Sequence, residues 1–256
     1  MDILGRPIDE PAVEARIDAL VARHARAGSG AMEVLNLIGA QAEGLLDRLP
    51  PEARARLGTV TERALLGAAE AAHGTRDSVP DMSQGRTRLL TTVMGAAGGA
   101  GGLPTALAEL PVTVTVLLRA IQDEAAAHGF DPTEPGVRFA SVEVFGTAGP
   151  LSDDDGADLG FIGARVTLTG AALRALIARV APRLAAVLGQ KLAAQSVPLL
   201  GAAAGAATNY AYTSYYQKMA QVHFGLRRLA IDADRDHGEL VEEFRALVIR
   251  PPVKRA

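Results

Sequence analysis

A glycine-rich apolar run over residues 89–102 constrains the fold of this chain more than any other feature. Five glycines lie in it, at Gly95, Gly98, Gly99, Gly101 and Gly102. Each glycine inside a helix costs up to about 1 kcal/mol relative to alanine. The run therefore stays helical only if it packs against another part of the protein or lies in an apolar surround.

The glycine spacing shows how such packing occurs. Gly95/Gly99 and Gly98/Gly102 are four residues apart, and so are Gly201/Gly205 in a second Gly/Ala-rich segment, 197–216. This spacing flattens one side of a helix so that another backbone can approach closely. Two interpretations follow and stay open: the helices pack tightly in a soluble core, or they face lipid.

The composition predicts the fold class. Apolar residues make up 48% of the 256-residue chain but aromatic residues only 4%, so the core must consist of Ala, Leu and Val. We expect an all-α, single compact multi-helix bundle over 1–256 with two central Gly/Ala-rich apolar helices. A three-helix segment at 9–74, with breaks at Gly28-Ser29-Gly30 and at Pro50-Pro51, should pack on the remainder.

Two segments leave helix and strand open. Residues 112–118 alternate with period two, which is typical of a half-buried strand, and 138–145 and 165–169 have similar character. We favour a helix over 112–128, because no turn signal follows and Arg119 and Asp123 can form an i, i+4 pair. Pro111 and Pro182 should interrupt or restart their helices. Residues 150–164 are expected to be a loop.

Several functional classes are excluded or disfavoured. The chain has no cysteine, its net charge is −3, and no basic stripe indicates nucleic acid as a partner. The glycine-rich dinucleotide motif fails at Pro104, and no phosphate-binding loop occurs. The five histidines lack ligand spacing, and Asp153-Asp154-Asp155-Gly156 lacks the other calcium ligands. We expect no metal and no cofactor.

The first thirty residues lack a signal peptide, and no confident membrane span occurs, so we expect a cytoplasmic location, peripheral on the inner face of the membrane.

The tyrosines are unusually concentrated. All four lie within eight residues: Tyr210, Tyr212, Tyr215 and Tyr216. Tyr212, Tyr215 and Tyr216 share one helical face, and Lys218 follows them. A Gly/Ala-rich helix that ends in tyrosines and a cation is typical of an interfacial anchor, in which the rings lie at headgroup level. Alternatively, the rings fill the space that small neighbours leave in a core.

Polar residues in apolar segments are the remaining candidates for a site. They are Glu109, Arg119, Glu143, Lys191 and Asn209. Buried ionisable groups are costly unless they are paired, and such groups concentrate at functional sites. If several converge, they form either a structural ion-pair network or a polar ligand pocket.

Two long patterns resemble the EcsC protein family. The first is Gly98–Pro104, followed by Leu118–Glu124 and His128–Asp131. The second is Gly189–Ala193, followed by Val197–Gly201 and Ala204–Tyr210, then Ala220, Phe224 and Arg227. Together they cover residues 85–230. The resemblance implies a bacterial, mostly helical protein and favours helix at 112–118. The family is named after a gene beside an ABC transporter, so it also implies an accessory role to a membrane transporter, and it supplies no catalytic residues.

These observations lead to one main hypothesis and two alternatives. The main hypothesis is a non-enzymatic, peripheral membrane-associated protein that binds lipid, acyl chains or a membrane-protein partner through 93–118 and 197–216. The first alternative is a hydrolase or lipid-modifying enzyme, with Glu109 or Glu143 as general base and Arg119 or Lys191 stabilising an anion. The second is a soluble scaffold without a ligand. We expect no enzymatic activity, because no nucleophile–base motif occurs.

Overall fold

All regular secondary structure that the computed structural model of the chain describes is helical. Described are residues 7–37, 47, 49–74, 83–100, 102–146, 170–195 and 201–249. The helices are α1 (Glu10–Leu37), α2 (Pro51–Gly74), α3 (Gln84–Ala100), α4 (Gly102–Ala127), α5 (Pro135–Glu143), the short 3-10 helix η2 (Val144–Gly146), α6 (Gly170–Gln195), α7 (Gly201–Ala233) and α8 (His237–Ile249). No strand occurs in these residues, which confirms the predicted all-α fold.

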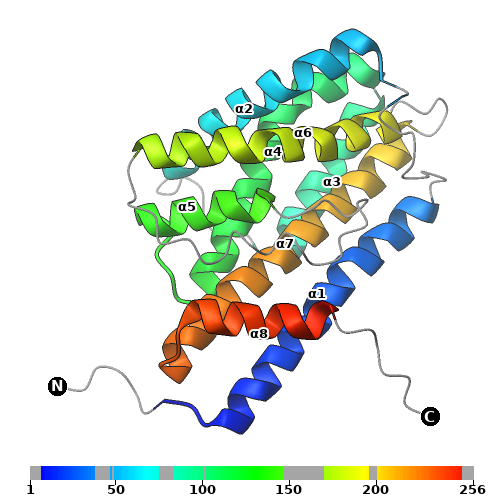
Figure 1. Cartoon of the computed structure of the whole chain (residues 1–256). Coiled ribbons are helices and arrows are strands. Elements are labelled where there is room, and N and C mark those ends of the chain that lie inside the picture. Colours follow the sequence, from blue (N-terminus) through cyan, green and yellow to red (C-terminus); the bar gives the residue numbers. More distant parts are fainter. Residues whose placement is uncertain are drawn as a thin grey trace.

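Helix α7 is the centre of the arrangement. It runs diagonally through the molecule with α1 alongside it, while α6 crosses the upper half and α8 the lower end (Figure 1). Helix α3 packs on α7 and α4, and α2 packs on α4 and α6. The apolar core is built mainly from the facing sides of α4, α6 and α7, including Leu117, Leu184 and Phe224.

The ends of the helices follow from local sequence. Asp9 accepts a hydrogen bond from the Ala12 amide at 3.2 Å and so begins α1, and Asp236 accepts from the Gly238 amide at 2.8 Å before α8. Helix α4 ends where expected, because Gly129 takes a positive φ of 82°. The Phe130 amide then donates to the Ala125 carbonyl at 3.1 Å, as in a Schellman motif.

The predicted break at Gly28-Ser29-Gly30 is wrong, because α1 runs through it. Ser29 does not begin a new helix; its hydroxyl donates to the Ala25 carbonyl one turn earlier, at 3.1 Å. Packing of α1 on α7 outweighs the weak helix propensity of the two glycines. Residues 10–37 are thus one helix rather than parts of two. The N-terminal helices do pack on the rest: α1 on α7, and α2 on α4 and α6.

The two ambiguous segments are helical where the structure describes them. Residues 112–118 lie inside α4, which confirms the helix interpretation, and 138–145 lie in α5 and η2, which makes the strand alternative wrong there. Pro111 and Pro182 lie within α4 and α6 rather than at helix ends, and both have exposed positions. The segments 150–164 and 165–169 lie outside the described residues.

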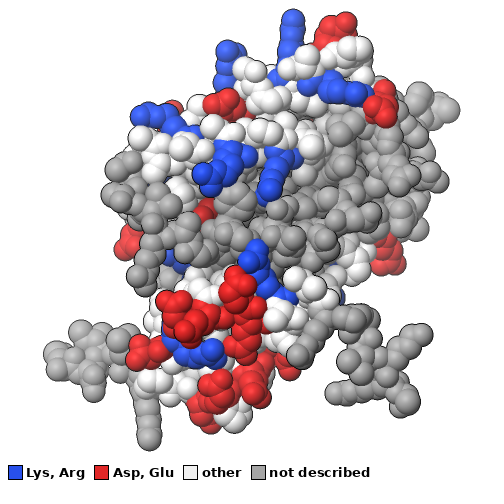
Figure 2. Space-filling view, viewed as in Figure 1, with Lys and Arg blue, Asp and Glu red and all other residues white. Residues whose placement is uncertain are grey.

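Charges are unevenly distributed on the surface. Acidic side chains gather at the lower end, over α8 and the end of α7, whereas basic side chains prevail over α2 and α6 at the top (Figure 2). Helix α8 contributes Glu239, Glu242 and Glu243, and α6 contributes the exposed Arg174, Arg179 and Arg183. The small net charge of −3 therefore conceals two ends of opposite sign.

Candidate functional site

A line of polar side chains on α7 faces α3 and is buried. Asn209, Thr213 and Gln217 follow Gly205 at intervals of four residues, so that successive members of this series are neighbours on the surface of α7. We call this series the polar seam. The two helices run antiparallel, since the low-numbered end of α3 meets Gln217 and its high-numbered end meets Gly205.

Hydrogen bonds hold α3 against the polar seam. Asn209 Nδ2 donates to the Thr91 carbonyl at 2.8 Å, and the Thr213 hydroxyl donates to Thr91 Oγ1 at 2.9 Å. Further along α7, Arg88 Nε donates to Gln217 Oε1 at 2.6 Å. The contact thus depends on matched donors and acceptors, each contributing about 1 kcal/mol net, rather than on large apolar side chains.

Gly95 brings the two backbones into direct contact. A Cβ atom there would overlap the Gly205 carbonyl oxygen and would lie 2.7 Å from Asn209 Nδ2. At this pair the glycine spacing therefore allows tight helix–helix packing. This is the first of the two interpretations that the sequence left open.

The polar seam ends at a buried carboxylate. Glu109 Oε1 accepts hydrogen bonds from the Thr113 hydroxyl at 3.0 Å and from Asn209 Nδ2 at 3.0 Å, and it pairs with Lys191 Nζ at 3.4 Å. Lys191 Nζ also donates to Thr113 Oγ1 at 3.2 Å. We call Glu109, Thr113, Lys191 and Asn209 the carboxylate cluster. It joins α4, α6 and α7.

Two acceptors of the carboxylate cluster lack a partner among the described residues. They are Glu109 Oε2 and Asn209 Oδ1, both buried. Glu109 Oε2 occupies the space that a side chain on Gly98 would take, since a Cβ atom there would overlap it. The second glycine of the α3 run therefore makes room for a carboxylate. The orphaned oxygens leave the cluster able to accept a further donor.

Burial lowers the pKa of Lys191. Its side chain is 1% exposed, and loss of hydration lowers the pKa from 10.5 to about 8, although the charge and hydrogen bond of Glu109 act in the opposite direction. Desolvation is therefore larger than the attraction of the pair, as is common for buried ion pairs.

This pKa predicts a pH dependence of stability. The unfolded chain binds more protons than the folded protein between pH 8 and 10.5, so the contribution of Lys191 to stability rises with pH across this window. The free energy of unfolding of the wild type relative to Lys191→Met is expected to increase by up to about 3 kcal/mol. Urea unfolding at pH 7.5 and 10.5 measures this; an unchanged difference would contradict the prediction.

The structure brings together three of the five predicted polar residues. Glu109, Lys191 and Asn209 meet in the carboxylate cluster. Arg119 instead pairs with Asp123 at 3.2 Å, which confirms the predicted i, i+4 pair, and it lies ten residues, or about 15 Å of helix, beyond Glu109. Glu143 lies near Arg227. The single constellation that the hydrolase hypothesis assumed is therefore divided, and that hypothesis stays a prediction.

Glu143 belongs to a second group of titratable side chains around Arg227. Burial raises the pKa of Glu143 to about 7, opposed by Arg227. Burial lowers the pKa of His223 to about 3, assisted by Arg227 and His237. A pocket of about 470 Å³ opens beside this group, where Arg227 lies over the Phe130 ring at 5.5 Å. In the described chain, no three His, Cys, Asp or Glu side chains form a metal site.

The tyrosines lie mostly in the core. Tyr212, Tyr215 and Tyr216 are buried, and the Tyr212 hydroxyl donates to the Val187 carbonyl on α6 at 3.1 Å. The Tyr216 ring packs edge-on against Phe145 and Tyr215. These three rings do not reach a surface, which corrects the expectation of an interfacial cluster. The cause is that α6 covers this side of α7. Only Tyr210 is exposed, at 41%.

Apolar side chains are exposed on the three adjoining helices α3, α4 and α7. Leu89, Leu90 and Val93 on α3 form what we call the apolar face, and Val112 on α4 and Tyr210 on α7 are exposed as well. Leu89 is 66%, Val93 59% and Val112 53% exposed. Helix α3 carries no charge from Leu89 to Ala100. None of the helices described is both long and apolar enough to cross a membrane.

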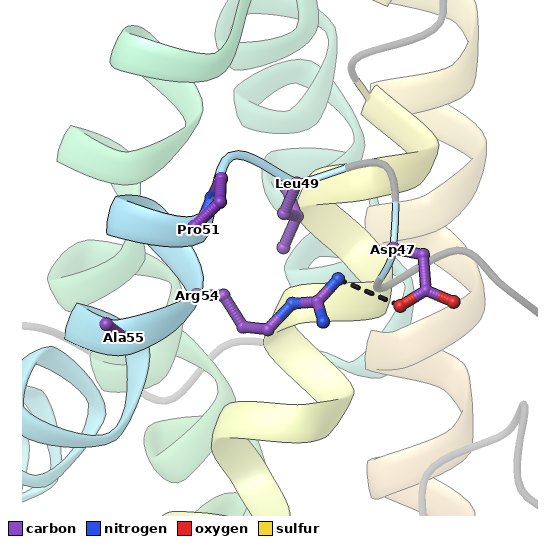
Figure 3. A pocket seen from close by; sticks show the side chains of 5 residues that line it. All are labelled: Asp47, Leu49, Pro51, Arg54 and Ala55. Carbon is purple, nitrogen blue, oxygen red and sulfur yellow. Dashed lines mark hydrogen bonds and ion pairs between the residues drawn. The ribbon is translucent and has the colours of Figure 1, made fainter.

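A second pocket, of about 360 Å³, lies at the start of α2. Arg54 reaches toward Asp47 and pairs with it at 3.0 Å, beside Leu49 and Pro51 (Figure 3). The cation and the carboxylate satisfy each other, so the described lining of this pocket offers no uncompensated charge to a ligand.

Sequence reasoning missed the threonines of the site. Thr113 lies four residues after Glu109, Thr213 four after Asn209, and Thr91 four before Gly95. Residues at this spacing share a helical face. The polar seam could therefore have been found by searching for small and polar residues, rather than apolar ones, at intervals of four.

Comparisons with known proteins identify a family but no solved relative. The pattern of the EcsC protein family matches residues 68–229, which include α3, α4, α6 and the polar seam. The "Uncharacterized protein YdbA" of Bacillus subtilis (strain 168) is 39% identical over 62 residues, which are 24% of this chain and 22% of that protein. The aligned stretch thus covers about a fifth of the relative. No solved structure matches. Because the pattern spans well over half of the chain, the protein belongs to the EcsC protein family.

Proposed function

We propose that this protein associates peripherally with a membrane surface through the apolar face, without an enzymatic role of its own. The observation that supports this is the exposure of Leu89, Leu90 and Val93 on a charge-free stretch of α3. Single exposed apolar residues are normal, but a group on one side of a helix indicates an interaction surface.

Lipid fits this face better than a soluble ligand does. The side chains of the apolar face are exposed on the outside of α3, which suits insertion into the boundary between headgroups and acyl chains. Arg86 precedes Leu89 by one turn on the same side of α3 and is exposed. A cation therefore lies next to the apolar residues, toward the N-terminal end of α3. Long basic side chains at the end of an apolar stripe are typical of membrane interfaces.

Flotation with phospholipid vesicles tests the proposal. We expect the wild-type protein to float with vesicles of phosphatidylcholine and phosphatidylglycerol. Leu89→Gln/Val93→Gln should weaken the partition by about 30-fold to 1,000-fold, because each side chain contributes about 1 to 2 kcal/mol when it leaves water. The measurement is the bound fraction as lipid concentration increases.

Ile249→Gln on α8 is the matched control. Ile249 is 60% exposed but lies at the acidic end, away from the apolar face. It should bind as the wild type does. Wild-type protein that stays with the unbound fraction would refute the proposal, and equal losses in both variants would show that general hydrophobicity, not this face, is responsible. If the apolar face instead binds a protein partner, the wild-type protein would stay with the unbound fraction.

A further inference from the structure

The pocket of about 470 Å³ at the C-terminal end of α7 has a lining that changes from basic to apolar to acidic along the chain. Arg227, Ala230, Ile231 and Asp234 all line it and have the i, i+3, i+4, i+7 spacing of one side of a helix. Phe130, which follows α4, lines it as well. A volume of this size is typical of sites for small molecules.

The cation of this lining has no direct acidic contact among the described residues. Arg227 is partly buried, and its guanidinium lies 5.5 Å from the centre of the Phe130 ring. The charge of Glu143 acts on it, but the two side chains form no ion pair within 4.0 Å, and burial raises the pKa of Glu143 to about 7. Arg235, also in the lining, already pairs with two carboxylates. A carboxylate of a ligand can therefore supply the contact that Arg227 lacks.

The acid at the other end of the lining is in the same situation. Asp234 is exposed, and its side chain forms no ion pair or hydrogen bond within the part of the chain that the structure describes. It follows Arg227 by seven residues, or about 10 Å along a helix. Ile231, which is 47% exposed, comes between the two in the series. A ligand that matches all three has a negative group, an apolar middle part and a positive group, in this order.

The surroundings of the pocket disfavour a ligand with negative charge alone. Acidic side chains gather over α8 and the end of α7, the two elements between which the pocket lies (Figure 2). Such a field repels an anion as it approaches and attracts an ammonium group. An α-amino acid has both charges, but they lie on the same side of its apolar part, which does not match the order along α7.

We propose that this pocket binds an ω-amino acid, a short zwitterion whose carboxylate contacts Arg227, whose methylene chain packs on Ile231 and whose ammonium group contacts Asp234. The guanidinium donates charge-assisted hydrogen bonds to the ligand carboxylate, and the ammonium group donates to the carboxylate of Asp234. The methylene chain leaves water when it packs on the apolar part of the lining. No described lining residue belongs to the apolar face, so this inference does not depend on membrane association.

Four ligands with chains of equal length test the order of the charges. The wild-type protein should bind 5-aminopentanoate with a Kd of about 1 mM. Pentanoate and pentylamine each lack one charge, and 2-aminopentanoate is an isomer whose charges are adjacent; all three should bind about 3-fold more weakly or worse. The shifts of the Ile231 amide and its neighbours in NMR titrations give both the site and the Kd. Unchanged shifts at about ten times this Kd, or equal affinity for 2-aminopentanoate, would overturn the inference.

Two substitutions assign the two charges. Arg227→Gln should bind 5-aminopentanoate about 10-fold more weakly, because a hydrogen bond to a charged group contributes about that much. Asp234→Asn should bind it about 3-fold more weakly, since an exposed ion pair contributes less, and its affinity for pentanoate should not fall. Asparagine tolerates the positive φ of 51° at this position, so the backbone is kept. Equal losses of 5-aminopentanoate and pentanoate in Asp234→Asn would show that Asp234 does not contact the ammonium group, and the inference would be wrong.

Three further variants serve as controls. Glu143 competes with the ligand for Arg227, so Glu143→Gln should bind about 2-fold to 5-fold more tightly. Arg56→Gln and Glu62→Gln change the net charge as the two pocket variants do, lie exposed on α2 at the end of the molecule away from α8 (Figure 1), and should bind as the wild type does. Thermal unfolding of each variant identifies loss of folding, and Arg227→Lys, which keeps the charge, should retain more affinity than Arg227→Gln. If Arg56→Gln weakens binding as much as Arg227→Gln does, overall charge rather than this pocket is responsible, and the inference fails.

Discussion

Glu109→Ala is expected to lower the free energy of unfolding by about 3 to 5 kcal/mol, the usual cost of removing one partner from a buried ion pair. Lys191 Nζ, in a side chain that is 1% exposed, would lose the carboxylate that favours its charged form. Thr113 and Asn209 would also lose the oxygen that accepts their hydrogen bonds. Urea unfolding monitored by circular dichroism measures the change.

A second substitution should restore much of this loss. Glu109→Ala/Lys191→Met removes both charges, and methionine fills most of the space of the lysine stem, so we expect the double variant to be more stable than Glu109→Ala alone. As a control, Glu242→Ala breaks the surface pair with Arg245, 2.9 Å apart, and should cost less than about 1 kcal/mol. Additive single and double effects would show that Glu109 and Lys191 are not coupled.

Gly95→Ala should destabilise the protein by about 3 kcal/mol, at the upper end of the range for overpacked interiors. The added methyl group would overlap the Gly205 carbonyl oxygen. That oxygen belongs to the backbone of a helix and cannot move by itself. The overlap can therefore be relieved only if α3 moves away from α7. Such a movement lengthens the hydrogen bond from Asn209 to Thr91. The melting temperature should fall by about 6 to 12 °C.

Two other glycines provide controls with the opposite sign. Gly67 in α2 and Gly85 in α3 have no heavy atom within 4 Å of the position that an added methyl group would take. Alanine at either position should stabilise its helix by a few tenths of a kcal/mol to about 1 kcal/mol, with the larger effect at Gly67 inside α2. If Gly95→Ala behaves like these two, the close approach of α3 and α7 is not required for stability.

From the sequence, the secondary structure can be predicted better than the surroundings of each side chain can. The helix through 112–118 can be predicted because the continuation to residue 128 lacks a turn signal, and Arg119 and Asp123 lie within a single helix. Such relationships depend on neighbours along the chain. The uninterrupted α1 could not be predicted, because packing on α7, some 190 residues away, outweighs the local signal of two glycines.

The candidate site shows the same limit. Glu109, Lys191 and Asn209 stand out in the sequence as polar residues in apolar segments, but only the packing of α4, α6 and α7 shows that they meet. Composition leaves open whether the tyrosines lie at an interface or in the core, whereas the contact of Tyr212 with the Val187 carbonyl shows that α6 covers that side of α7. Composition indicates that a helix has a small or aromatic face, and tertiary contacts decide whether that face is covered.

The polar seam also bears on how the protein responds to temperature. Exposing apolar surface raises the heat capacity of a protein, whereas exposing polar surface lowers it. The seam joins α3 to α7 through Asn209, Thr213 and Gln217, so separating these side chains carries only a small heat-capacity change. Apolar contacts weaken on cooling. The attachment of α3, and with it the position of the apolar face, therefore keeps its strength in the cold while the leucine core around α6 loses part of its own.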